Sequence, residues 1–159
     1  MSGPLLRWDR GRSVIDDLLK RDELQRVTAD PEAALRLLRV ARTHLASAAT
    51  IRQDDPTLAL AASYDAARKA CVALLEAQGL RATSRGGHIA LREAVEAQFL
   101  GLSGADPVRA LDRLRRRRNA AEYLEADIDD AEAAEGHGRA EAIVAFAEGV
   151  LASLPPYGR

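Results

Sequence analysis

Apolar residues recur at helical spacing along most of this chain, and aspartate–proline pairs mark where helices begin. The pairs are Asp30-Pro31, Asp55-Pro56 and Asp106-Pro107. In each pair a capping carboxylate precedes a proline whose missing N–H costs nothing in the first helical turn. The pairs predict helices over 31–52, over 56–78 and from 107 to about 123. Gly79 is expected to end the second of these helices.

Three further helices are predicted around this framework. An amphipathic pattern runs over 13–27, a shorter one follows the Gly86-Gly87 pair as far as about Gly101, and the last runs over 129–154. Glycines weaken the first half of the last segment and predict a late start or a kink. No segment alternates as a strand would, and β-branched and aromatic residues are sparse.

These helices predict an all-α fold. The expected architecture is an antiparallel four-helix bundle with an extra N-terminal helix and a short inserted helix. Residues 1–30 form an N-terminal arm with its amphipathic helix, and residues 31–154 form the bundle. Residues 155–159 are expected to be a frayed tail. Trp8, flanked by charged residues in the arm, is suited to packing on the bundle or to anchoring a partner.

Composition narrows the function classes. The net charge is −1 and the pI is near 6.3, so no global field attracts nucleic acid or a membrane surface. Aromatic residues make up 4% of the chain, which disfavours a stacking platform for single strands. Cys71 is the only cysteine, which excludes an intrachain disulfide and a cysteine-based zinc site. With no long apolar run, a cytoplasmic protein without a membrane segment is expected.

The strongest local feature is the run Arg115–Arg118. Consecutive helical residues point about 100° apart, so four arginines cannot share one solvated face. The apolar stripe that leads into the run is Val108, Leu111 and Leu114. One turn further, this stripe reaches Arg118, whose guanidinium is therefore expected where a core or interface side chain belongs. Glu122, four residues on, is its expected partner. A solvated face with one buried ion pair is the competing interpretation.

Three stretches resemble HEPN domains. Residues 64–70 (YDAARKA), followed by 74–80 (LLEAQGL), resemble the second HEPN helix. The pair Gly87-His88 is similar to the glycine–histidine that often opens the next helix there. Residues 117–123 (RRNAAEY) are similar to the Arg-Asn-x-x-acidic-Tyr ending of the HEPN motif helix. Together the stretches place the resemblance over roughly 31–154.

The resemblance implies a helical bundle that dimerises through its motif helices. Many HEPN domains are metal-independent ribonucleases of toxin–antitoxin, defence and RNA-processing systems, and others are non-catalytic partners of small nucleotidyltransferases. The ribonuclease motif is an arginine, four to six residues, then a histidine. Here Tyr123 follows Arg118 at that spacing, and the next histidine is His137. Arginine can stabilise a phosphorane, but a tyrosine with a pKa near 10 is a poor proton carrier near pH 7.

Two functions are therefore expected. The favoured one is a HEPN-type subunit of a toxin–antitoxin or defence module, a homodimer that binds a nucleotidyltransferase or antitoxin partner. The alternative is a metal-independent ribonuclease at the dimer interface, or RNA binding without cleavage. The candidate catalytic residues are Arg118, Asn119, Glu122 and Tyr123. The candidate nucleic-acid-binding residues are Arg113, Arg115, Arg116 and Arg117. By the resemblance, a partner could modify Tyr123.

The histidines and the glycine-rich stretch point to no cofactor. The chain has three histidines, without zinc-ligand spacing, so neither a metal nor a cofactor is expected. His88, beside the Gly86-Gly87 turn, is interpreted mainly as a helix-start residue that packs on the bundle. Its alternative roles are a phosphate ligand or a remote general base.

Overall fold

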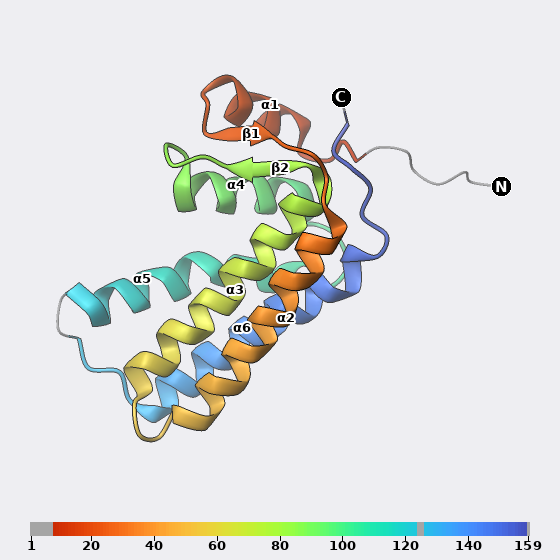
Figure 1. Ribbon diagram of the computed structural model, residues 1–159. Helices are drawn as coiled ribbons and strands as arrows, with labels where there is room; N and C mark the ends of the chain where they lie inside the picture. The colour runs from red at the N-terminus through yellow and green to blue at the C-terminus, as the bar shows by residue number, and fades with distance from the viewer. Residues whose placement is uncertain (1–7, 124–125, 159) are drawn as a thin grey trace.

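The computed structural model describes residues 8–123 and 126–158 and shows a predominantly helical fold with one small sheet (Figure 1). The all-α class is confirmed. Its elements are α1 Arg12–Lys20, β1 Leu24–Arg26, α2 Pro31–Ile51, α3 Pro56–Gln78, β2 Leu80–Ala82, α4 Gly87–Phe99, the 3-10 turn η1 Asp106–Arg109, α5 Ala110–Tyr123 and α6 Asp130–Leu151.

Two of the three Asp-Pro pairs cap helices as predicted. The Asp30 carboxylate accepts from the Ala33 N–H at 2.9 Å, and the Asp55 carboxylate accepts from the Leu58 N–H at 3.0 Å. Gly79 ends α3 in the left-handed conformation, with a φ of 78°. The third pair differs, because Asp106 caps nothing: its side chain is exposed, and Asp106–Arg109 form a 3-10 turn ahead of α5.

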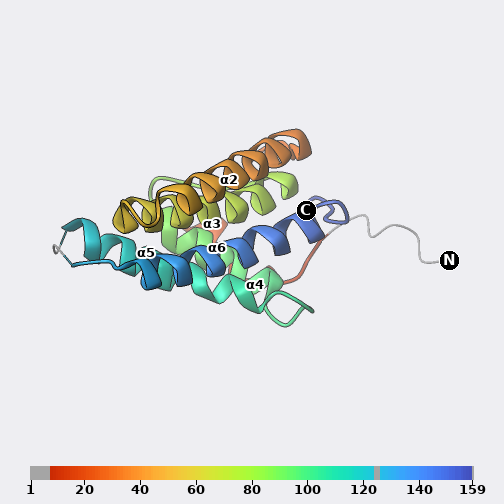
Figure 2. The ribbon, with the colours of Figure 1, turned by 90° about the horizontal axis from the view of Figure 1, so that it is seen from below.

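Helix α3 is the centre of the fold. It packs against α2, α4, α5 and α6, as the two views of the ribbon show (Figures 1 and 2). Its many alanines let the neighbouring helices approach closely, and its leucines Leu60, Leu74 and Leu75 are almost completely buried. Within the described ranges, no helix is both long enough and apolar enough to cross a bilayer.

The N-terminal helix is shorter than predicted, and the expectation of no strands is wrong. Helix α1 ends at Lys20, and Asp22 then takes a φ of 57°, which a continuing helix cannot accommodate. The chain returns as β1, antiparallel to β2, with Leu24 opposite Ala82. Each strand has only three residues, too few for an alternating pattern to stand out in the sequence.

Helix α6 begins at its Asp129 cap and continues to Leu151, so the expected late start or kink does not occur. Its two first-half glycines have different surroundings. A Cβ at Gly136 would lie 2.5 Å from Leu60 Cδ1, whereas a Cβ at Gly138 would meet nothing within 4 Å. Gly136 therefore permits the close approach of α3 and α6, and this packing sustains a helix that intrinsic propensity disfavours.

The C-terminal tail is packed, which corrects the expectation that it is frayed. Tyr157 is buried, its N–H donates to the Gln78 carbonyl at 2.9 Å, and it forms a parallel bridge with Trp8. The Trp8 ring lies 5.6 Å from the Phe99 ring, so this tryptophan packs on its own chain. Backbone hydrogen bonds and aromatic burial hold the tail over 155–158; Arg159 and residues 1–7 lie outside the described residues.

Candidate functional site on helix α5

Helix α5 is anchored at its first half only. Leu111 and Leu114 are its buried residues, and from Arg115 to Tyr123 no residue is buried. In both ribbon views the C-terminal end of α5 lies at the edge of the molecule (Figures 1 and 2). We call the segment 115–123 the outer half of α5. It carries most of the candidate site residues.

Every arginine from Arg113 to Arg118 in α5 is paired with a carboxylate. The pairs are Arg113–Glu135 at 3.6 Å, Arg115–Asp112 at 3.5 Å, Arg116–Asp112 at 2.7 Å, Arg117–Glu132, and Arg118–Glu122 at 3.3 Å. Glu132 and Glu135 belong to α6, so two of these pairs also fasten α5 to its neighbour. The candidate nucleic-acid-binding arginines are therefore partly neutralised within the chain, which weakens a purely electrostatic attraction to RNA.

Arg118 pairs with Glu122 as predicted, but the expected burial is wrong. The two side chains are 36% and 48% exposed, so the pair lies at the surface. The guanidinium lies 5.8 Å from the centre of the Tyr64 ring, and it also donates to the Asn119 side chain at 3.3 Å. Beyond Leu114 the outer half of α5 has no fully buried residue, and it meets the core through the partly buried Ala121.

Tyr64, His88 and Asp112 form a polar cluster between α3, α4 and α5. The Tyr64 hydroxyl lies 3.2 Å from His88 Nδ1, and His88 Nε2 lies 3.5 Å from Asp112 Oδ1. The His88 and Asp112 side chains are each only 15% exposed. His88 is thus a packed helix-start residue, as favoured from the sequence, and it also has polar partners on two other helices.

Burial and neighbouring charges adjust the titration of this cluster. Burial lowers the pKa of His88, and the nearby Arg115 lowers it further. Burial also raises the pKa of the Tyr64 hydroxyl. For Asp112, burial acts to raise the pKa, but Arg116, Arg92 and Arg115 overcome it and lower the pKa. Near neutral pH the cluster therefore holds a neutral imidazole, a neutral phenol and an ionised carboxylate.

Sequence reasoning missed Tyr64 and Asp112 as partners of His88. Tyr64 is in the stretch that resembles the second HEPN helix, and Gly87-His88 is in the next such stretch. Because both stretches resemble parts of one domain, they were a signal that Tyr64 and His88 lie close together. Asp112 had a weaker signal, since it lies three and four residues before Arg115 and Arg116, where helical neighbours meet.

Tyr123 lies apart from the other polar groups. It is 72% exposed, and five residues along an α-helix correspond to a rotation of about 140° from Arg118. His137, the next histidine in the chain, instead contacts the Leu45 carbonyl at 3.0 Å. One chain therefore brings Arg118 together with Asn119, Glu122 and Tyr64, while Tyr123 points to a different side of α5.

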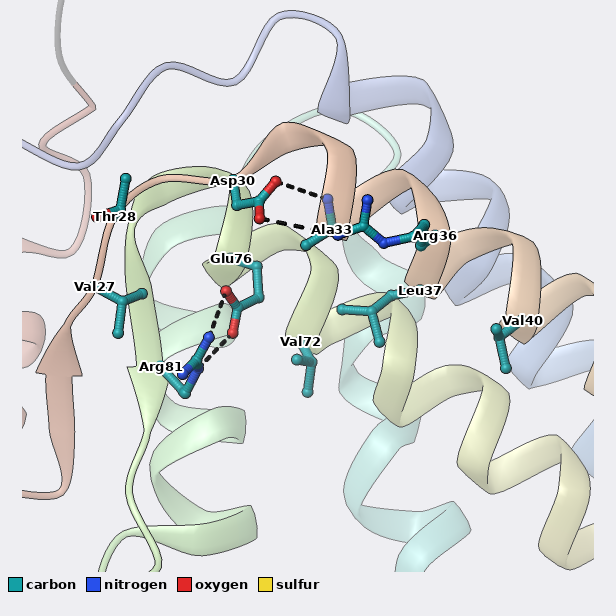
Figure 3. Close-up of a pocket in the computed structure, with 10 residues that line it drawn as sticks. All are labelled: Val27, Thr28, Asp30, Ala33, Arg36, Leu37, Val40, Val72, Glu76 and Arg81. Atoms are coloured by element: carbon teal, nitrogen blue, oxygen red, sulfur yellow. Dashed lines mark hydrogen bonds and ion pairs between the residues drawn. The ribbon is translucent and has the colours of Figure 1, made fainter.

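A pocket away from α5 is a weaker candidate site than the cluster between α3, α4 and α5. The pocket in Figure 3 has a volume of about 590 Å³ and lies between α2, α3 and β2. Its carboxylates already serve the fold, because Glu76 holds Arg81 at 2.7 Å and Asp30 caps α2. Among the described residues, no group of three or more histidine, cysteine, aspartate or glutamate side chains is arranged to hold a metal ion.

Comparison with protein-family models, curated proteins and solved structures found no match.

Proposed function

We propose that this chain is a HEPN-type subunit of a toxin–antitoxin or defence module and acts through dimerisation and partner binding. The observation that carries the proposal is the outer half of α5, nine residues without one that is buried. A helix is usually stabilised by burying one face, and this segment is only partly covered by its own chain. A second protein surface would supply the missing contact.

In this proposal two α5 helices meet across a two-fold axis. Ala120 and Ala121 are small enough to allow close approach, and the charges of Arg118 and Glu122 are self-complementary across such an axis. Helices α2, α3, α5 and α6 would then be the four helices of a HEPN-like antiparallel bundle. Helix α1 would be the N-terminal addition and α4 the inserted helix.

The proposed partner is a nucleotidyltransferase or an antitoxin. Tyr123 supports this because a phenol that is 72% exposed at the edge of a helix is open to an approaching protein. A nucleotidyltransferase that modified Tyr123 would add a bulky anionic group beside the outer half of α5 and change how that surface associates.

Sedimentation and small-angle scattering test the dimer. We expect a dimer at working concentrations, weakened by Ala121→Glu because a charge would enter the interface. Ala49→Glu, at an exposed position of α2, is the matched control and should leave the mass unchanged. A compact monomer for the unaltered chain would contradict the proposal, as would an Ala121→Glu variant that associates normally.

The alternative is a metal-independent ribonuclease that uses Arg118 and Tyr123 at the dimer interface. One observation favours it: Arg118 and His88 both contact Tyr64, so a neutral imidazole lies near the arginine although the motif histidine is absent. His88 could accept a proton near pH 7. The interaction function is preferred because His88 and Tyr64 are largely buried, which restricts access by RNA.

Incubation with total RNA in EDTA separates the two functions. The interaction function predicts no cleavage by the purified protein, and it predicts that Tyr123→Phe keeps fold and dimer. The ribonuclease function predicts cleavage that Arg118→Ala abolishes and that Tyr123→Phe and His88→Gln strongly reduce. Arg12→Ala is the matched control, since Arg12 is an exposed arginine of α1 rather than of α5. Cleavage that persists in Arg118→Ala would indicate a contaminant or a different site.

A further inference from the structure

A groove runs between the start of α2 and the end of α6, away from α5. Both helices pack on α3, and Figure 2 shows them diverging toward the C-terminal end of α6. The groove has a volume of about 750 Å³, and its floor is apolar, with Leu38, Leu151 and Leu154. On its lip lies Leu35, which is 43% exposed.

Opposite charges flank Leu35 on the same side of α2. Glu32 lies three residues before it and Arg39 four residues after it, and both side chains are exposed. Neither makes an ion pair within the described residues, whereas nearby Arg42 is held by Glu141 at 2.5 Å and also by Glu148. This side of α2 therefore presents a negative, an apolar and a positive side chain over two helical turns. The exposed Arg36, four residues after Glu32, lies 4.0 Å from the Asp30 carboxylate.

Such a pattern is complementary to itself. When two copies of a helix pack antiparallel about a two-fold axis near the apolar residue, each negative end meets the positive end of the other copy. Here the axis would pass near Leu35, Glu32 of each copy would face Arg39 of the other, and each Leu35 would be covered by the partner's apolar groove. Neither charge would have to break an existing pair within its own chain.

We infer that this face of α2, which consists of Glu32, Leu35 and Arg39, binds a second copy of the chain. This interface is separate from the outer half of α5 and does not depend on it. A chain that uses both interfaces forms an assembly larger than a dimer, and a chain that uses only the α2 face forms a dimer.

Charge exchange tests this pairing by sedimentation over a concentration series. Arg39→Glu or Glu32→Arg alone places like charges opposite each other twice, and each should weaken this association step at least about tenfold. The double variant Glu32→Arg/Arg39→Glu restores opposite charges and should recover most of the association. Arg12→Glu, at an exposed position of α1, makes the same charge change as Arg39→Glu and should have no effect.

The outcome is independent of the α5 proposal. If both interfaces form, Arg39→Glu reduces the larger assembly to a dimer held by α5, while Ala121→Glu removes the α5 contact. If only the α2 interface forms, Arg39→Glu yields a monomer and Ala121→Glu changes nothing. The inference is overturned by an unaltered chain that is monomeric at about 100 µM, by a mass that Arg39→Glu leaves unchanged, or by a double variant that fails to recover association.

Discussion

Helix α3 and the outer half of α5 show two opposite uses of the same secondary structure. Helix α3 is buried along most of its length and on several sides, while the outer half of α5 has no buried residue. The sequences explain the contrast. Alanine and leucine let α3 take contacts from all directions, whereas consecutive arginines leave α5 no apolar side after Leu114. The core helix is held by packing and the outer one by ion pairs and its anchored first half.

Several polar side chains in and around α3 are buried, unlike those of the outer half of α5. The side chains of Gln78 and Gln98 are buried and bond to each other, so their desolvation is partly compensated. Burial also raises the pKa of the Cys71 thiol to about 12, which keeps it protonated and unreactive. In contrast, the Arg118 and Glu122 side chains of the outer half of α5 are 36% and 48% exposed, so their pairing can be exchanged for contacts with another surface.

The largest expected effect comes from truncating one side chain in each region. Leu74 is fully buried in α3, so Leu74→Ala should lower the free energy of unfolding by about 2–5 kcal/mol. Tyr123→Ala, at the end of α5, should change it by less than about 0.5 kcal/mol because this side chain is 72% exposed. Urea unfolding of both variants measures the difference. Comparable losses would mean that the end of α5 is part of the core.

A second pair of variants tests how closely α3 and α6 pack. Gly136→Ala forces its new Cβ against Leu60, whose side chain is itself buried, and should cost about 1–2 kcal/mol. Gly138→Ala enters open space and should stabilise by up to about 1 kcal/mol through helix propensity. Thermal unfolding measures both the expected loss for Gly136→Ala and the expected gain for Gly138→Ala. A stabilising Gly136→Ala would show that the contact with Leu60 relaxes easily.

The third comparison sets the two ends of α5 against each other. Asp112 is 15% exposed and forms ion pairs with Arg92, Arg115 and Arg116. Asp112→Ala should therefore lower the free energy of unfolding by about 1–2 kcal/mol. Glu122→Ala removes one partner of a surface pair and should cost less than about 1 kcal/mol, after allowance for screening by solvent. Chemical denaturation at low and high salt measures both losses. A larger loss for Glu122→Ala would mean that the Arg118–Glu122 pair is buried, as expected from the sequence.

The fold was largely predictable where local chemistry decides it. Capping by Asp30 and Asp55 and the stop at Gly79 are local, and they set the bounds of α2 and α3 to within a residue. Tertiary contacts decide what was missed. Leu24 forms a strand because Leu80–Ala82 lies beside it, and Gly136 keeps α6 continuous because Leu60 leaves no room for a side chain.

In the candidate site, too, contacts within one helix were predictable and contacts between helices were not. The Arg118–Glu122 pair follows from spacing along one helix and was predictable. Its exposure was not, because burial depends on how far α5 stays in contact with α3. The contact between Tyr64 and His88 joins two residues that lie on different helices and are 24 positions apart in sequence, a separation that no periodicity reports.

The smallest expected effect is on the pH dependence of stability, and His88 carries it. This histidine faces Tyr64 from α3, Asp112 and Arg115 from α5, and Arg92 from its own helix. Burial, reinforced by Arg115, lowers its pKa below the ordinary value of 6.5. The unfolded chain therefore binds this proton at a higher pH than the folded chain does, so the free energy of unfolding should fall as pH drops from about 7 toward 5.

His88→Gln removes this titration and keeps a side chain that can bond to Tyr64. Its unfolding midpoint in urea should therefore fall less steeply than that of the unaltered chain between about pH 7 and pH 5. Protonation of Asp112 also lowers the free energy of unfolding as the pH falls. It does so at lower pH, because the pKa of Asp112 lies below its usual range, so it does not mimic the effect of His88. Equal slopes for the two proteins would mean that His88 takes up a proton without cost, and that the cluster between α3, α4 and α5 is as hydrated as the outer half of α5.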